Sequence, residues 1–136
     1  MSEIGGTIVE NEVLTRTCRS WIDERGIIHS VAFPGSEETF EDAKENVAVT
    51  ARLAGASKRP MLVDLRQAKS MSREVRQYYA GAETQRVLVA TALLIGSPLS
   101  RAIGNFFMGL NKPIVPTRLF NDEAAAIAWL STFRAA

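Results

Sequence analysis

Apolar residues recur along this chain in two rhythms, one typical of strands and the other typical of helices. Runs rich in β-branched, aliphatic and aromatic residues predict strands. Such runs lie at residues 12–22, 27–33, 61–65, 86–95 and 114–120. Apolar residues spaced three or four positions apart predict amphipathic helices. This spacing is found at residues 40–54, 72–82, 97–110 and 121–133.

The order of these elements predicts the fold class. Two strands joined by the turn residues 23–26 form an N-terminal hairpin. Strands and helices then alternate, which predicts an α/β domain with a mostly parallel, mixed sheet, right-handed crossovers and four principal helices. The continuous apolar run at 86–95 suits a strand near the centre of the sheet that is covered on both faces. Pro116 places the last strand at an edge.

Capping residues and apolar stripes delimit the helices. Ser36 or Thr39 caps the first helix and Gly55 ends it, while Asn121 caps the last helix. The inner stripe of the third helix is predicted to be Leu99, Ile103, Phe106 and Leu110. The residues of the first helix expected to face away from the sheet are Glu41, Asp42, Lys44 and Glu45.

Composition limits the classes of protein that fit. With 136 residues, 46% of them hydrophobic, the chain is long enough for one domain with one core. We expect residues 10–134 to form that domain after a flexible N-terminus at residues 1–9, with a short strand around Thr7 to Val9 as an alternative for its last residues. A formal net charge of +1 gives no electrostatic reason to expect nucleic acid as a partner. The longest apolar run, Val87–Ile95, is less than half the ~20 residues of a membrane-spanning helix.

Cysteine and histidine each occur once, as Cys18 and His29. A lone cysteine cannot form an internal disulfide, which is typical of proteins in a reducing cytoplasm. The acidic, glycine-containing start of the chain also lacks the features of a signal peptide. One cysteine and one histidine are too few for a zinc site with the usual nitrogen and sulfur ligands, and we expect neither a metal nor a cofactor.

The element order resembles that of the STAS domain, the fold of bacterial anti-sigma-factor antagonists such as SpoIIAA and of sulfate-transporter cytoplasmic domains. The resemblance covers residues 10–134. Its specific matches are Leu62-Val63-Asp64-Leu65 and Phe120-Asn121-Asp122-Glu123-Ala124 leading to Trp129-Leu130. The segment 96–110 looks like an uncharacterised bacterial branch of SpoIIAA-like proteins. It also resembles the wider group that connects this fold to CRAL-TRIO-type lipid carriers.

The regulatory signature of the STAS family is a phosphorylatable serine directly after an aspartate, at the start of the helix that follows the Asp-Leu strand. Counting from Val63-Asp64-Leu65 puts Ser72 in the place of the aspartate and Arg73 in the place of the serine. The match fails at the modified residue, so we expect that the standard phosphorylation does not switch this chain. A shift of one residue would put Ser72 in the serine position, where a phosphate would meet a positive helix N-terminus.

Two serine-containing loops are candidates for a ligand site. Ligands of parallel sheets lie beyond the carboxyl ends of the strands, and residues 66–73 and 96–101 are expected to meet there. Their hydroxyl, guanidinium and backbone amide groups suit a phosphate, a carboxylate or a lipid headgroup. The candidate residues are Arg66, Ser70, Ser72, Arg73, Ser97, Ser100 and Arg101. The alternative is that the serines cap helices and the arginines are solvated.

The sequence lacks the motifs of common enzymes. It has no Gly-x-Ser-x-Gly elbow, no P-loop and no dinucleotide-binding glycine pattern. We expect His29 to be a packed or surface histidine and Asp64 to bond to loop amides. Cys18 is expected to be a half-buried thiol, whose pKa Arg19 would lower only if the thiol were exposed.

We therefore interpret the chain as a non-enzymatic STAS-like regulatory or scaffold domain that acts through protein–protein interaction in the bacterial cytoplasm. The alternative is a small binding module or carrier for a lipid or anionic metabolite at the two loops. An apolar cavity opening near residues 97–108 would favour that alternative, whereas a core-filled seam between sheet and helices would favour the interaction domain.

Self-association is a further expectation, because a net charge of +1 gives little repulsion between copies. The candidate contacts of a homodimer are Phe107 and Met108, residue types that are enriched at interface cores. Phe107 lies about 100° around the helix from Phe106 and so outside the centre of the inner stripe. The alternative is that both candidates widen the buried face of their helix.

Overall fold

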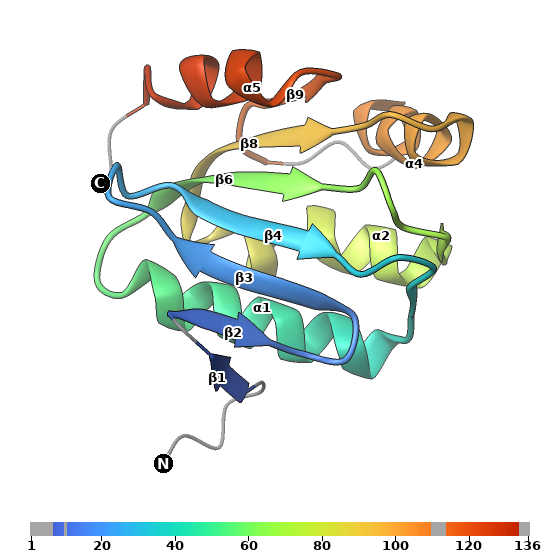
Figure 1. Ribbon diagram of the computed structural model, residues 1–136, viewed down its shortest axis with the longest axis horizontal. Helices are drawn as coiled ribbons and strands as arrows, with labels where there is room; N and C mark the ends of the chain where they lie inside the picture. Colours follow the sequence, from blue (N-terminus) through green and yellow to red (C-terminus); the bar gives the residue numbers. More distant parts are fainter. Residues whose placement is uncertain (1–6, 10, 110–113, 134–136) are drawn as a thin grey trace.

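One large mixed sheet dominates the computed structural model, which describes residues 7–9, 11–109 and 114–133 (Figure 1). Its strand order is β1-β2-β3-β4-β6-β8-β9, and β5 and β7 form a separate two-stranded sheet. The strands are β1 (Thr7–Val9), β2 (Glu12–Leu14), β3 (Cys18–Ile22), β4 (Ile28–Ala32), β5 (Glu37–Glu38), β6 (Arg59–Asp64), β7 (Ser70–Met71), β8 (Leu88–Leu94) and β9 (Thr117–Phe120). Strands β1 to β4 are antiparallel, and β4, β6, β8 and β9 are parallel.

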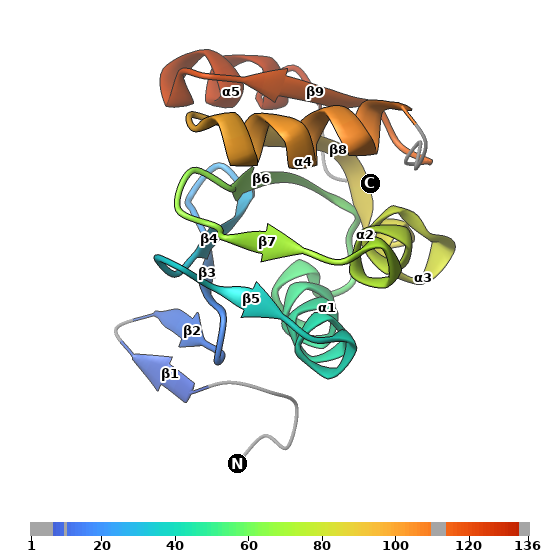
Figure 2. The same cartoon turned by 90° about the vertical axis from the view of Figure 1, so that its right-hand side faces the viewer.

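The helices are divided unequally between the two faces of this sheet. They are α1 (Phe40–Ala54), α2 (Arg73–Ala80), α3 (Ala82–Gln85), α4 (Pro98–Gly109) and α5 (Glu123–Leu130). Helices α1, α2 and α3 lie behind the sheet in the view of Figure 1, and α4 lies beyond the carboxyl ends of β6 and β8. Helix α5 packs on the opposite face, against β6, β8 and β9 (Figure 2). In the described part of the chain, no helix combines the length and apolarity needed to cross a bilayer.

Strand β8 shows why its sequence is continuously apolar. Leu93 is buried in the cluster that includes Val75 of α2 and Ile103 of α4. Its neighbour Leu94 points to the other face and is buried with Leu130 of α5. A strand covered on both faces has no solvent side on which polar residues would alternate. The prediction that 86–95 contains an interior strand is confirmed, and so is the edge position of β9.

The predicted elements are confirmed with a few corrections. Helix α1 spans the predicted residues, and Thr39 and Gly55 cap its ends. Four of the helices have eight or more residues, as predicted. Residues 72–82 are not one helix, because the short α3 is separate from α2 and begins at Ala82, which is exposed. The single strand predicted at 12–22 is wrong. Thr15 accepts a hydrogen bond from the Cys18 amide and donates its own amide to the Cys18 carbonyl, so the chain reverses there and gives β2 and β3.

Three side-chain predictions are also wrong. Asp122, rather than Asn121, caps α5 by accepting a hydrogen bond from the Ala125 amide. Leu99 is 45% exposed, because the first turn of α4 directs Ser100 inward instead. Asp42 is buried rather than facing solvent. Ile103 is buried as predicted, whereas the side chains of Phe106 and Leu110 lie outside the described part of the structure.

The burial of Asp42 follows from its place at the start of α1. Its carboxylate accepts hydrogen bonds from the Thr39 amide and hydroxyl. In return the Asp42 amide donates to the Thr39 hydroxyl, and the two residues form a capping box. The same carboxylate is ion-paired with the guanidinium of Arg16 in the turn between β2 and β3. That pairing, together with the Thr39 bonds, outweighs burial and lowers the pKa of Asp42 from its ordinary 3.8 to about 2.

A first prediction concerns this aspartate. Asp42→Asn keeps the shape but removes the charge, so it should lower the free energy of unfolding at pH 7 by about 1–2 kcal/mol. Because the folded-state pKa is depressed, the stabilisation is complete above about pH 4 and is lost as the pH falls toward 2. Urea unfolding of both proteins between pH 7 and pH 2.5 should show the gap closing. A gap that stays constant would show that the charge is not its source.

A second prediction concerns the contact of α4 with β9. A Cβ atom at Gly104 would lie 2.9 Å from a methyl of Leu119 and 3.2 Å from a methyl of Ile95. Gly104→Leu should therefore destabilise the protein by about 1–3 kcal/mol through overpacking. The matched control is Ala102→Leu on the exposed side of the same helix, which should change stability by less than about 0.5 kcal/mol. Equal denaturation midpoints for the two variants would contradict this packing.

Candidate functional site

A partly enclosed cavity lies between the sheet and helices α1, α2 and α3. Its volume is about 90 Å³. Most of its wall is apolar and comes from the strands, with Met61, Val63 and Leu93 among the lining residues. The helices contribute mainly polar side chains. They include Asn46 and Thr50 of α1, Tyr79 of α2, and Thr84 and Gln85 of α3.

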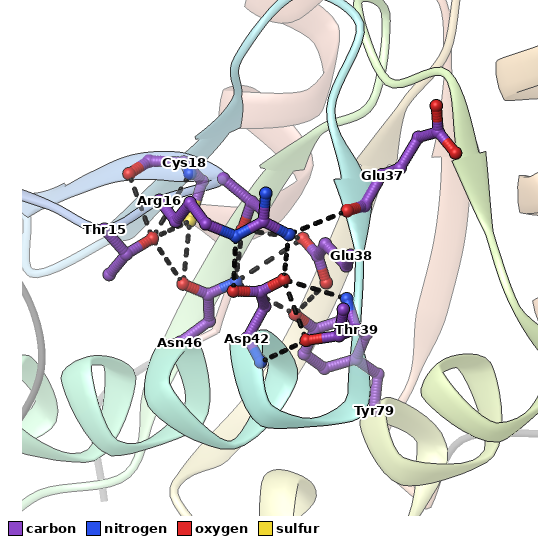
Figure 3. A network of polar contacts seen from close by, with 10 residues as sticks. Thr15, Arg16, Cys18, Glu37, Glu38, Thr39, Asp42, Asn46 and Tyr79 are labelled. Atoms are coloured by element: carbon purple, nitrogen blue, oxygen red, sulfur yellow. Dashed lines mark hydrogen bonds and ion pairs between the residues drawn. The ribbon is translucent and has the colours of Figure 1, made fainter.

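Polar side chains of the cavity lining converge around Glu38, and we call this part of the cavity the Glu38 end. Figure 3 shows the network that they form. The Tyr79 hydroxyl donates a hydrogen bond of 2.5 Å to the Glu38 carboxylate. The Asn46 amide nitrogen lies 3.2 Å from the Tyr79 hydroxyl and 3.4 Å from the second Glu38 oxygen. The Thr17 hydroxyl also lies 3.4 Å from that second oxygen. One carboxylate oxygen therefore has a short hydrogen bond, while the other has only long contacts.

Burial shifts the titration of the groups at this end. It raises the pKa of Glu38, against the opposing effect of the Tyr79 hydrogen bond. It also raises the pKa of Tyr79 well above its ordinary value, with the nearby Glu38 carboxylate adding to the shift. Both shifts favour the protonated, uncharged form of the group concerned. Perturbed groups that line a cavity are candidates for a functional site.

Cys18 lines the same cavity, but its thiol is not activated as a nucleophile. It is 3% exposed, and its thiol donates to the Asn46 carbonyl oxygen over 3.3 Å. Burial raises the pKa of the thiol, so the nucleophilic thiolate is disfavoured. The expectation of a structural thiol rather than an activated one agrees with this environment, although the residue is more deeply buried than expected.

Thr91 of β8 contributes a different kind of group to the cavity wall. The residue is 7% exposed, and its hydroxyl has no hydrogen-bond partner among the described residues. Buried hydroxyls are normally bonded to protein or to ordered water. The Thr91 hydroxyl therefore marks a point where a molecule inside the cavity would gain a hydrogen bond.

The two predicted serine loops meet at the carboxyl end of the sheet. The side chain of Arg66 lies against Gly96, since a Cβ there would be 3.1 Å from the Arg66 Cγ. Ser72 caps α2, and its hydroxyl accepts from the Val75 amide. Ser97 and Ser100 each accept a hydrogen bond from the other's backbone amide. All three serines thus make the capping contacts that the sequence left open as an alternative.

The remaining candidates of this site are arginines and one strand residue. Arg66 forms an ion pair with Asp64 over 2.8 Å, and Asp64 also accepts from the Arg66 amide as expected. Ser70 is exposed in β7, and Arg73 and Arg101 are exposed at the starts of α2 and α4. The seven candidate residues therefore border one edge of the molecule, and none of them lines the interior cavity.

A second hollow of about 240 Å³ lies on the other face of the sheet, beside α5. Trp21 and His29 stack there with ring centroids 4.7 Å apart, and Arg19 lies 4.9 Å from the Trp21 ring. The His29 ring nitrogen is 2.8 Å from Asp23. Burial of Asp23 acts to raise its pKa, but hydrogen bonds from His29 and neighbouring groups prevail and lower it. His29 is thus a packed histidine, as expected.

Sequence reasoning missed the interior cavity. One signal for it was present, because Asn46 and Thr50 interrupt the apolar stripe of the first helix on its inward side. Glu38 gave no such signal, since a glutamate before a helix start is ordinary. Its inward direction depends on Tyr79, which lies 41 positions away in the sequence.

Comparisons with known proteins identify the fold. An uncharacterised protein of the DUF3478 family from Shewanella loihica PV-4, described as having a SpoIIAA-like fold, superposes with a TM-score of 0.63 at 15% identity, covering 92% of this chain and 99% of that one. A protein of unknown function from Arthrobacter sp. FB24 is 28% identical over 84% of this chain and 99% of its own, with a TM-score of 0.32. No curated protein matches this chain.

The fold predicted from the element order is therefore confirmed, and the protein has a SpoIIAA-like α/β fold. The family model described as "Domain of unknown function (DUF7793)" matches residues 20–134, which is most of the chain. The protein thus belongs to the DUF7793 family.

Proposed function

We propose that this protein is a non-enzymatic STAS-type regulatory or scaffold domain that acts by contact with another protein. The observation that carries the proposal is the outer face of β3 and β4. Helix α5 packs on β6, β8 and β9 on that side of the sheet. Beside it, Trp21 and Val31 remain partly exposed and line the 240 Å³ hollow.

The chemistry of this hollow suits a protein partner. Its lining includes the aromatic ring of Trp21, the aliphatic side chain of Val31, and the side chains of Arg19 and Arg66. Tryptophan and arginine are enriched among residues that dominate protein interfaces. Both arginines are already paired with acidic neighbours, so they offer a partner polar contacts without a large excess of positive charge. We therefore place an apolar side chain of the partner against Trp21 and Val31.

The contacts of the reactive side chains support binding rather than catalysis. His29 is held between Trp21 and Asp23, and Cys18 is buried. The hydroxyls of Ser97 and Ser100 bond to each other and to backbone amides. Each group therefore serves a local structural purpose.

The bacterial source and cytoplasmic location of the protein remain predictions from the sequence.

A small binding module at the two serine loops is the second candidate function. The close approach of Arg66 to Gly96 favours it, because it brings the loops together. A phosphate, carboxylate or lipid headgroup there would contact exposed Arg73 and Arg101. A carrier cavity near residues 97–108 is not favoured, since the described lining of the interior cavity comes from other segments.

Self-association through α4 also remains part of this proposal. Met108 is 39% exposed on that helix, as a contact residue would be. The side chain of Phe107, the other candidate, lies outside the described part of the structure.

A third prediction tests the outer face of β3 and β4. Val31→Glu should weaken binding of a protein retained by the wild-type chain from an extract of its source organism, by about tenfold or more in Kd. The matched control is Ile114→Glu, which places the same charge at a residue that is 67% exposed elsewhere. Circular dichroism should show that both variants are folded. A partner that binds all three proteins equally would refute this location.

A fourth prediction tests the homodimer by sedimentation. The wild-type chain should be a dimer at tens of micromolar, and Met108→Glu should be a folded monomer. Leu99→Glu is the control, because Leu99 is also exposed on α4 but lies about 180° around the helix. A monomeric wild type, or dissociation by Leu99→Glu alone, would remove Met108 from the interface.

A further inference from the structure

The size of the interior cavity limits what it can hold. A single water needs about 10–15 Å³ of such space, and an engineered cavity of about 150 Å³ takes up benzene. At about 90 Å³, the cavity between the sheet and α1–α3 lies between these sizes. It therefore has room for a molecule of a few non-hydrogen atoms, or for a small group of waters.

The walls of the cavity favour an aliphatic molecule over water alone. Methionine, valine and leucine side chains of β6, β8 and the adjoining segments form most of the wall, and Met71 of β7 is among them. Water inside a protein is held by two to four polar partners. Other polar residues line the wall, but Thr50, Thr84, Gln85 and Thr117 already bond to backbone groups. Glu38 and Thr91 are the groups of the lining with hydrogen-bonding capacity to spare. An aliphatic chain would fill the apolar middle without losing hydrogen bonds.

The Glu38 end supplies an acceptor that the protein does not fully use. One oxygen of the carboxylate receives the short hydrogen bond from Tyr79, and the other has only contacts of 3.4 Å, from Thr17 and Asn46. The nearby cation Arg16 is committed to Asp42 and to the Glu37 carbonyl. A ligand that donates a hydrogen bond to the second oxygen of Glu38 would complete its coordination.

Thr91 is an independent observation that points to a ligand. Its hydroxyl is buried in the cavity wall without a partner among the described residues. Valine has nearly the same shape and would fill this position without leaving a polar atom unpaired. The hydroxyl therefore gains a hydrogen bond only when a polar group occupies the cavity.

From these observations we propose that the cavity binds a small aliphatic alcohol or amine, whose donor group bonds to Glu38 and whose chain packs against Met61 and Met71. An alcohol and an amine share the required donor. A carboxylate of the same length lacks that donor and brings a second negative charge to Glu38, so the cavity excludes it. This inference concerns the isolated chain and is independent of the proposed protein contact.

The experiment uses the full chain with ¹³C-labelled methionine methyl groups. Met61 and Met71 line the cavity, whereas Met108 is exposed on α4 and serves as an internal control. The probes are 1-butanol, butylammonium and butyrate, titrated separately at neutral pH. We expect saturable shifts of the Met61 and Met71 resonances with 1-butanol or butylammonium at millimolar concentrations. Met108 should not move, and butyrate should give no saturable shift.

Two variants of nearly unchanged shape identify the polar contacts. Glu38→Gln removes the charge and should weaken butylammonium by about tenfold while changing 1-butanol by less than about threefold. Thr91→Val should raise the melting temperature of the free protein, because the unpaired hydroxyl is gone.

The proposal is overturned if neither donor molecule gives a saturable shift at Met61 and Met71, which would leave water as the occupant. It is also overturned if butyrate binds as well as butylammonium, or if Met108 shifts in parallel with the cavity methionines. These results come from the wild-type chain and do not depend on whether either variant folds.

Discussion

The attachment of the α1 N-terminus to the β2–β3 turn is the interaction on which the rest of the structure depends. Arg16 in that turn pairs with Asp42, and its guanidinium also donates to the Glu37 carbonyl of β5. One residue earlier, the Thr15 hydroxyl donates to the Asn46 side chain over 2.6 Å. A turn, a short strand and a helix are thereby held together, although they are distant in the sequence (Figure 3).

This attachment also determines what the same side of α1 presents to the cavity. Because Asn46 is fixed by the turn, its amide group faces Tyr79 and Glu38 at the end of the cavity. A valine or leucine at such a position would pack directly against the sheet. The polar network therefore takes the place of part of an apolar core. Buried polar groups of this kind define one arrangement of their neighbours, since each requires a partner in a fixed direction.

The two faces of the sheet are covered unequally because of the way the chain crosses from strand to strand. Successive crossovers from β4 to β6 and from β6 to β8 place α1, α2 and α3 on one side, as right-handed connections require. Only α5 remains to cover the other side, and it reaches β6, β8 and β9. The antiparallel strands β3 and β4 therefore keep an outer surface with the Trp21–His29 stack. In this fold an internal cavity and an external hollow lie on opposite sides of the same strands.

The sequence by itself determined the order of the main elements, the limits of α1 and the two-sided burial of β8, because apolar periodicity and helix caps are local signals. The short elements β5, β7 and α3 were not predicted. It did not predict the break between β2 and β3, which rests on the hydrogen bonds of Thr15 to Cys18. It also did not predict the inward direction of Asp42, Asn46 and Glu38. Their partners are Arg16, Thr15 and Tyr79, which lie 26, 31 and 41 positions away in the chain. Only the tertiary structure brings such residues together, because the direction of a polar side chain depends on the partner it meets and not on its neighbours in sequence.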